Sequence, residues 1–261
     1  MDIAIIAIVA ALASALTLYS GFGLGTILLP AFALFFPAPV AVAATGVVHL
    51  LNNLFKGTLL RKRVDWSTVL KFGLPALPAA IAGAWLLAVL GDTPRLFEWT
   101  LFDRTFGPTG AGVTVGVLMI LFAALELQRS FQALTAPSRL MPLGGIVTGF
   151  IGGLTGQQGA LRSIFLLRSG LPAERLIATG VMIAIIVDLS RLTTYAASFA
   201  ATGLNAEGRE GLLVLVGTVS AFVGAFAATR HLDKITIGAI RYSVAALLLL
   251  IGALMVGGVL G

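Results

Sequence analysis

Apolar runs follow one another almost without interruption from Ile3 to the last residue, Gly261, and the polar breaks between them are short. Hydrophobic residues make up 58% of the 261 residues and charged residues 11%, whereas a soluble domain is about one-quarter charged. Such a chain has too little polar surface to face water on all sides. Helices satisfy their backbone polar groups internally and can therefore cross lipid. The sequence predicts an all-α polytopic integral membrane protein with a single membrane domain, 1–261.

Each half of the chain contains five apolar segments in the same order. In the first half they cover roughly 3–19, 26–36, 40–60, 69–90 and 111–127, and in the second half 140–154, 160–168, 173–199, 211–229 and 235–260. The first two segments of each half read as a glycine-rich broken hairpin, and the other three read as full crossings. A conventional hydropathy count would instead score about eight helices, because the first run is nearly long enough to span alone.

Short landmarks also recur in both halves. A glycine-rich run opens the second segment of each half, GFGLG at 21–25 and GGLTG at 152–156. A turn containing proline precedes each third segment, which then carries Ala-Thr-Gly-Val at 44–47 and again at 178–181. Matching landmarks in the same order indicate a duplication. The two repeats that we expect cover 3–127 and 140–260.

The loop charges predict that these repeats are inverted. The basic loops 61–71 and 168–175 are both expected in the cytoplasm, and the acidic-leaning stretch 91–108 outside. The residues from 141 to 168 extend about 42 Å as helix, which is too short for two crossings of a core about 30 Å thick. They must dip in and return. One re-entrant hairpin and three crossings per half give the halves opposite orientations, with both termini on the periplasmic side of a bacterial inner membrane.

The two glycine-rich tips are the first candidates for a binding site. Broken helices at equivalent positions of inverted repeats present free N–H groups at mid-membrane. The candidates are Gly23 and Gly25 at the first tip, and Gln157, Gln158, Gly159 and Arg162 at the second. The glycines could instead serve only tight turns and close helix contacts. Arginine in hydrocarbon costs about 2.5 to 3.5 kcal/mol, so Arg162 should face protein, water or ligand, unless it reaches the membrane boundary or pairs with a carboxylate.

A polar stripe on segment 40–60 is the second candidate. At about 100° per residue, five side chains share one face of this helix: Thr45, His49, Asn52, Asn53 and Lys56. Five polar residues on one stripe indicate the lining of a cavity. Lys56 has an alternative reading, because it lies near the basic loop and could extend its amine toward it.

The matching helix of the second half carries Asp188, Arg191 and Tyr195 within about 60° of one another. Arg191 could bind an oxyanion, while Asp188 balances its charge when the site is empty. His49 is the other group that could titrate near neutral pH, so Asp188 and His49 are the candidates for coupling. A purely structural salt bridge between Asp188 and Arg191 is the main alternative.

Enzyme and nucleic-acid functions fit the sequence poorly. His49 and His231 stand in unrelated settings, and the sequence has no HExxH motif. Neither Ser163 nor Ser190 lies in a G-x-S-x-G motif. We therefore expect no catalytic residues, cofactor or metal. The net charge is +6, but the basic residues cluster beside apolar segments, as in cytoplasmic loops, so no nucleic-acid partner is expected.

Two long stretches of the chain resemble the sulfite exporter TauE/SafE family of polytopic membrane proteins. They are GFGLGTILLPAFALFFPAPVAVAATGVVHLLNNLFK at 21–56 and GFIGGLTGQQGALRSIFLLRSGLPAERLIATGVMIAIIVDLSRLTTY at 149–195. The resemblance implies export of a small sulfur-containing anion, such as sulfite or an organosulfonate, coupled to a gradient of H⁺ or Na⁺. The second repeat reads GQQGALRS where many members are glycine-rich with a following proline, so the substrate can differ from sulfite.

Two other functions are left open beside secondary transport. An anion channel would use the same buried cations but could not accumulate substrate against its gradient. A membrane accessory or assembly factor would transport nothing and would tolerate changes at Arg162, Asp188 and Arg191. The expected partners are the lipid bilayer, the small anion and a coupling ion, and a homo-oligomer is left open.

Overall fold

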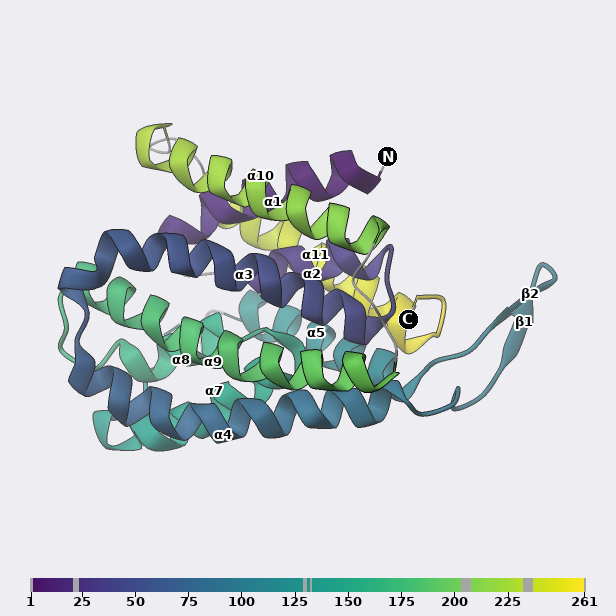
Figure 1. Ribbon diagram of the computed structural model, residues 1–261, viewed down its shortest axis with the longest axis horizontal. Coiled ribbons are helices and arrows are strands. Elements are labelled where there is room, and N and C mark those ends of the chain that lie inside the picture. Colours follow the sequence, from purple (N-terminus) through teal and green to yellow (C-terminus); the bar gives the residue numbers. More distant parts are fainter. Residues whose placement is uncertain are drawn as a thin grey trace.

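The computed structural model describes residues 2–20, 24–128, 131, 133–202, 208–231 and 237–260. Within these residues the chain is almost entirely helical (Figure 1). The α-helices are α1 (Asp2–Ser20), α2 (Leu24–Ala33), α3 (Ala38–Leu60), α4 (Trp66–Gly91), α5 (Gly110–Leu127), α7 (Met141–Thr155), α8 (Gly159–Leu166), α9 (Ala173–Thr202), α10 (Arg209–His231) and α11 (Ile237–Val256). Each expected apolar segment corresponds to one of them, which confirms the all-α polytopic fold class.

Side-chain caps begin helices α4 and α5, and a glycine ends helix α7. The side chain of Asp65 accepts a hydrogen bond from the Thr68 backbone N–H at 2.9 Å and caps the start of α4. Thr109 caps α5 in the same way through Gly112, at 3.0 Å. Helix α7 stops at Gly156, whose φ of +79° is a left-handed conformation that glycine adopts without strain.

Among the residues that the structure describes, four helices are long and apolar enough to span a membrane by length and composition. They are α3 together with the short helix η1 (Arg61–Arg63), α4, α5 and α9. Shorter apolar runs occupy α1, α2, α10 and α11. Large apolar side chains of α4, including Leu74 and Trp85, point away from the protein with about two-thirds of their surface exposed, at 66% and 61%. This outward apolar surface suits contact with lipid.

The main helix pairs of one half have counterparts among the helix pairs of the other half. Helix α4 packs along α7, and correspondingly α10 packs along α1. Helix α9 lies against both α3 and α4, while α3 lies against both α9 and α10, and α5 pairs with α11 (Figure 1). Exchanging each helix for its counterpart leaves this set of contacts unchanged, as a duplication predicts. The repeat boundaries and the inverted orientation stay predictions.

Small residues bring the helix pairs into close contact. Gly145, Gly149 and Gly153 follow one another at four-residue spacing along α7 and face α4. A Cβ atom at these three positions would lie 2.1, 2.3 and 2.1 Å from a backbone oxygen of α4. Gly224 has the same role on α10, where a Cβ would lie 2.0 Å from the Ala11 backbone oxygen of α1. Close backbone approach of this kind is the usual way that helices associate in lipid.

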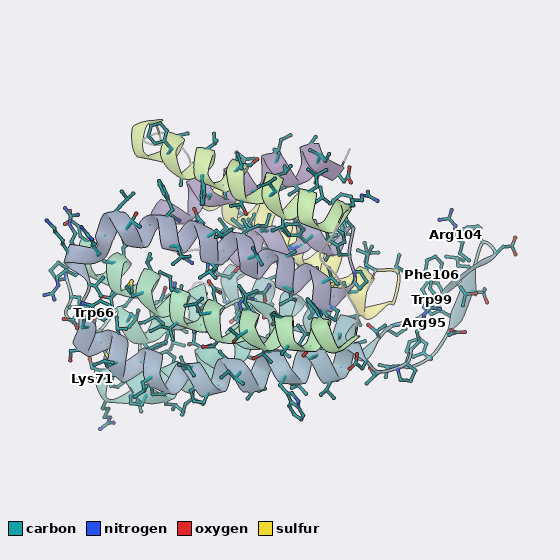
Figure 2. All side chains as sticks on the ribbon, viewed as in Figure 1. Trp66, Lys71, Arg95, Trp99, Arg104 and Phe106 are labelled. Atoms are coloured by element: carbon teal, nitrogen blue, oxygen red, sulfur yellow. The ribbon has the colours of Figure 1, made fainter. Side chains whose placement is uncertain are left out.

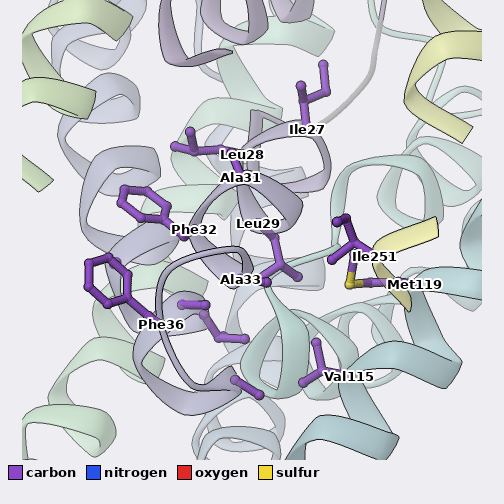
Figure 3. Packing of buried hydrophobic residues seen from close by; sticks show 14 of the residues in the cluster. Ile27, Leu28, Leu29, Ala31, Phe32, Ala33, Phe36, Val115, Met119 and Ile251 are labelled. Carbon is purple, nitrogen blue, oxygen red and sulfur yellow. The ribbon is translucent and has the colours of Figure 1, made fainter. Parts of the chain in front are cut away.

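Helix α2 fills the middle of the protein. All of its residues from Leu24 to Ala33 are buried. Figure 3 shows its side chains, among them Leu29 and Phe32, within a cluster that also receives Met119 of α5 and Ile251 of α11. The first broken hairpin is therefore an apolar core element.

A short β-hairpin interrupts the helical fold in the stretch 91–108, where the sequence analysis expects only a loop. Strands β1 (Trp99–Leu101) and β2 (Arg104–Phe106) pair antiparallel, and the Trp99 and Phe106 rings lie 4.8 Å apart. The turn residues Phe102 and Asp103 have φ of 49° and 57°. The hairpin projects beyond the helices, at the end of the protein opposite Trp66 (Figure 2).

Short helix η2 (Ser138–Leu140) precedes α7. Hydrogen bonds connect the residues around η2 to the end of α8. The Ser138 hydroxyl donates to the Arg168 carbonyl at 2.8 Å. The Ala136 backbone N–H likewise donates to the Ile164 carbonyl at 2.8 Å. The chain thus enters α7 and leaves α8 at neighbouring points.

Candidate functional site

A buried carboxylate, Asp188, is the centre of the polar cluster inside the helical bundle. Its side chain has no solvent exposure and receives N–H donors from three parts of the chain. His49 Nδ1 lies 2.6 Å from Oδ2, Arg191 Nε donates to Oδ1 at 3.0 Å, and Gln158 Nε2 donates to Oδ1 at 3.3 Å. Helix α3 of the first half and the α7–α8 tip and α9 of the second half therefore meet at one residue.

Helix geometry and one glycine explain how Arg191 reaches this position. Asp188 and Arg191 are three residues apart on α9, so their side chains share one face. Gly46 on α3 leaves room for the guanidinium, because a Cβ there would lie 3.2 Å from Arg191 Cζ. The close approach of α3 to α9 thus encloses Arg191, whose side chain has no exposed surface.

The polar stripe predicted on α3 divides between two neighbours. Asn53 stays with His49, and its Nδ2 lies 3.2 Å from Nδ1 and 3.3 Å from Nε2 of the ring. Asn52 points toward α1 instead, where the Ser14 hydroxyl donates to its Oδ1 at 3.2 Å. Thr45 is fully buried and donates to its own helix, to the Ala41 carbonyl at 2.8 Å. The stripe is interior, as expected, but only part of it faces Asp188.

The second tip connects a further cation to this centre. The amide of Gln158 is buried, with 1% of its surface exposed, and it has partners at both ends. Its Nε2 faces Asp188, and its Oε1 accepts a hydrogen bond from Arg162 Nη1 at 3.4 Å. Arg162 is half-buried beside Gly180 of α9, and among the described residues no carboxylate forms an ion pair with it. Gln158 therefore bridges the carboxylate and an uncompensated guanidinium.

Several buried polar atoms have no hydrogen-bond partner. These are Arg191 Nη1 and Nη2, Gln157 Nε2 and Oε1, Asn52 Nδ2 and Thr148 Oγ1. Arg191 Nη2 lies 2.9 Å from Asp188 Oδ1, within ion-pair distance, but its N–H groups are not aligned for a hydrogen bond. Leaving such donors unpaired costs about 1 to 3 kcal/mol each, and more for a charged group. Oxygen atoms of a bound anion could satisfy those of Arg191 and Gln157.

The two glycine-rich tips touch each other, and the second tip contacts the guanidinium of Arg191. A Cβ on Gly25 would lie 3.0 Å from the Gly156 backbone oxygen, so the tips touch. A Cβ on Gly156 would lie 2.7 Å from Arg191 Nη1. Gly159 begins α8, and its carbonyl accepts a hydrogen bond from the Ser163 hydroxyl at 3.0 Å. Gly23, the remaining candidate at the first tip, lies outside the described residues.

Lys56 lies in the interior away from the carboxylate contacts, whereas Tyr195 lies beside Arg191. Lys56 is buried, with 9% of its surface exposed, and has no ion pair within the part of the chain that the structure describes. The Tyr195 hydroxyl donates to the Gly153 carbonyl, which ties α9 to α7. Direct contact of either residue with a substrate stays a prediction.

The formal charges of this cluster favour an anion. Asp188 is the carboxylate of the group, and the described cations linked to it are Arg191, directly, and Arg162, through Gln158. The two guanidiniums and the carboxylate give this cluster an excess of one positive charge. Buried like charges in low dielectric repel one another strongly, and an anion relieves that repulsion.

Two glycines of the site were not assigned to it from the sequence. Gly46 and Gly156 both contact the Arg191 guanidinium, although the sequence analysis used them only as landmarks of the repeat. The repeated Ala-Thr-Gly-Val string was the signal that could have found Gly46. Ser14, the partner of Asn52, had no such signal, because an isolated serine in an apolar run is common.

The fold and the cluster define a polytopic helical membrane protein with a buried ionic centre between its halves. The family model described as sulfite exporter TauE/SafE matches residues 6–255 of this chain. The protein belongs to the TauE/SafE family, which is a family of membrane transporters and not of enzymes. No curated protein and no solved structure matches the chain.

Proposed function

We propose that this protein is a secondary transporter that exports a small sulfur-containing anion, of the sulfite or organosulfonate class, with coupling to an ion gradient. The observation that carries the proposal is the guanidinium of Arg191. It is fully buried where the two glycine-rich tips meet, and two of its nitrogen atoms have no hydrogen-bond partner. The family membership supports the substrate class.

The donors around Arg191 suit the oxygens of a sulfite or sulfonate group. Two terminal nitrogens of a guanidinium can bind two oxygens of one anion in parallel. The amide of Gln157, buried with 2% exposure and unpaired at both ends, supplies a further donor. Asp188 balances the charge of Arg191 in the empty site, so an entering anion competes for the guanidinium instead of meeting a bare charge.

The membrane arrangement belongs to the same proposal. The basic loops after α3 and before α9 are held together by ion pairs, Arg63 with Glu174 and Arg175 with Asp65, each at 2.9 Å. This contact supports a common, cytoplasmic side for both loops. The Ser138–Arg168 hydrogen bond supports a second hairpin that dips into the membrane and returns. Both termini would then be periplasmic, in a bacterial inner membrane.

Inverted repeats at 3–127 and 140–260 offer a mechanism for alternating access. His49 and Gly25 belong to the first repeat, whereas Gly156, Asp188 and Arg191 belong to the second. Rocking of one repeat against the other would open the same cluster to one side and then to the other. The contacts of His49 with Asp188 and of Gly25 with Gly156 join the two proposed repeats and support this mechanism.

Purified protein in liposomes provides the test. Vesicles loaded with sulfite or a small sulfonate should release it faster than protein-free vesicles, with saturation, and sulfate and chloride should compete weakly. Arg162→Ala should raise the concentration for half-maximal flux about tenfold, because a charge-assisted contact of about 1.5 kcal/mol or more is lost. Arg139→Ala is the matched control, because Arg139 is exposed and should leave flux unchanged.

Three results would contradict the proposal. Absence of flux for any sulfur anion would favour an accessory or assembly role. Saturable flux that never exceeds the substrate's own gradient, whatever ion gradient is imposed, would indicate a channel. Equal flux by Arg162→Ala and Arg139→Ala would remove Arg162 from the site.

A further inference from the structure

We infer that the coupling ion is a proton, bound by the His49–Asp188 pair, and that it crosses the membrane in the same direction as the anion. This inference rests on the proposed transport function and deepens it, because that function leaves the coupling ion and the sense of coupling undefined. It is built on the contacts of Asp188 and on the charges that surround them.

The environment of Asp188 disfavours a sodium ion. Both carboxylate oxygens already receive N–H donors, Oδ2 from His49 and Oδ1 from Arg191 and Gln158. A metal cation needs oxygen ligands, so it would have to displace these donors. It would also have to remain beside the Arg191 guanidinium, which lies 2.9 Å from the same carboxylate and repels it.

His49 offers a place for a proton that costs no existing contact with the carboxylate. An ionised carboxylate can only accept hydrogen bonds, so Nδ1 carries the hydrogen in its 2.6 Å contact with Asp188. The lone pair of neutral His49 is then on Nε2, where the Asn53 amide nitrogen lies 3.3 Å away. When Nε2 takes a proton, the Asn53 amide turns so that its oxygen accepts the new N–H. A proton arriving from water bonds to Nε2 and gives an imidazolium beside the carboxylate, and its later release to water restores the neutral ring. Neither step requires an additional reactant.

The charged groups around His49 determine when it takes the proton. Arg191 faces the pair from α9, Arg162 faces it from α8 through Gln158, and Lys56 lies two turns along α3. Tyr195 of α9 is a further titratable group beside the pair, and its hydroxyl donates to the Gly153 carbonyl. On the other sides of α3, Ser14 of α1 and Phe222 of α10 make uncharged contacts. In the empty site these cations oppose a further positive charge. An anion at Arg191 offsets them and favours protonation of His49.

This mutual attraction defines the sense of coupling. If the anion strengthens proton binding, the proton must strengthen anion binding by the same factor. The two ligands therefore load together and leave together, which is cotransport. Exchange in opposite directions would need a site at which anion and proton compete. A monovalent anion leaving with one proton also moves no net charge.

The experiment uses wild-type protein in liposomes with a pH-sensitive dye outside. The probe is methanesulfonate, which stays a monoanion near neutral pH, so that proton movement reports on the protein and not on the substrate. Sulfite efflux is measured in parallel to test the proposed function itself. We expect outward methanesulfonate flux to acidify the medium by about one proton per anion, and we expect a potassium diffusion potential to leave the flux unchanged.

Two variants separate the proton site from general damage. His49→Gln keeps a hydrogen-bonding side chain at the Asp188 contact but cannot take a second proton. In the flux that it retains, the proton-to-anion ratio should fall to zero and a membrane potential should now change the rate. Lys71→Gln is the control, because Lys71 is exposed in the second turn of α4 and should preserve the wild-type ratio.

The outcomes are distinct. Alkalinisation of the medium, a requirement for sodium, or a proton ratio unaffected by His49→Gln would overturn the inference while leaving anion transport established. Absence of both sulfite and methanesulfonate flux in the wild type would overturn the proposed function, and with it this inference.

Discussion

The two broken hairpins occupy equivalent places in the two halves, but they differ in chemistry. In the first, α2 is buried from Leu24 to Ala33 and is apolar apart from Thr26. In the second, the tip carries Gln157 and Gln158 and leads directly into Arg162 on α8. The second tip contacts the Arg191 guanidinium through Gly156, and the first tip contacts Gly156 through Gly25. The two hairpins therefore lie together at the site, while the second provides most of its polar groups.

The largest effect should come from the Asp188–Arg191 ion pair, which contacts the second tip. Asp188→Asn or Arg191→Gln leaves one buried charge without its partner, which costs about 3 to 5 kcal/mol of folding stability. The double variant removes both charges and should unfold at a higher temperature than either single variant. All three should lose transport, as measured in liposomes.

This double variant also decides between the two roles of the pair. Full recovery of transport together with stability would mean that the salt bridge is purely structural, which is the alternative that the sequence left open. Recovery of stability without transport would assign Arg191 to substrate binding.

Replacement of Gly156 at the second tip by alanine should reduce transport more than the same replacement at Gly170, which has a similar backbone conformation. Gly156→Ala places a Cβ 2.7 Å from Arg191 Nη1 and also forces alanine into the left-handed region, which costs about 1 to 2 kcal/mol. Gly170 has a similar φ of +76° but no atom within 4 Å of a Cβ. Gly170→Ala should therefore lose only the backbone contribution and retain transport. Equal transport by the two variants would show that space beside Arg191 is unimportant.

Substitution of one polar side chain in each hairpin should change transport efficiency by a smaller amount. Gln158→Leu removes a donor from Asp188 and the acceptor of Arg162, and should lower transport efficiency about tenfold, since hydrogen bonds to charged groups contribute about 1.5 to 3 kcal/mol. Thr26→Val, at the first hairpin, should change it less than about twofold. Similar losses in both would mean that the two hairpins share the chemistry.

The smallest effect should lie away from both hairpins, at the loop before α4. Hydrogen bonds from Thr68 and the nearby charge of Arg175 hold the pKa of Asp65 below its ordinary value of 3.8. Because the folded-state pKa is the lower one, its stabilising contribution is present above about pH 4 and is lost as pH falls through the folded-state value. Asp65→Ala should cost about 1 kcal/mol at pH 7, whereas Asp65→Asn preserves the cap.

Thermal unfolding of these two variants and the wild type at pH 7 and pH 3 checks this assignment. The difference between wild type and Asp65→Asn should shrink at the lower pH. A difference that stays constant would mean that the charge of Asp65 is unimportant, and that capping alone accounts for its effect.

Much of the fold could be predicted from the pattern of apolar runs. All ten expected segments are helices, because hydrocarbon leaves the backbone no other partner for its polar groups. The β-hairpin at 99–106 was missed. Its strands are only three residues long and form through one aromatic contact, Trp99 with Phe106, for which a short polar stretch gives little signal.

The site was predictable in its residue types but not in its pairings. The sequence indicated that His49, Asp188 and Arg191 are interior, because charge in an apolar helix must face the protein. It could not indicate that His49 and Gln158 reach the same carboxylate, since those contacts join residues 139 and 30 positions apart. Nor could it separate Asn52, which faces α1, from Asn53, which faces the ring of His49.

The amino-acid sequence by itself determined the helical membrane class, the repeated landmarks and the presence of buried charge. These follow from local physics, namely the cost of exposing backbone and charge to hydrocarbon. Only the tertiary structure decided which charges meet and which donors stay unpaired. That depends on how closely α3, α9 and the two tips approach, and the approach is permitted by glycines such as Gly46 and Gly156, whose importance lies in the neighbouring atoms that they admit.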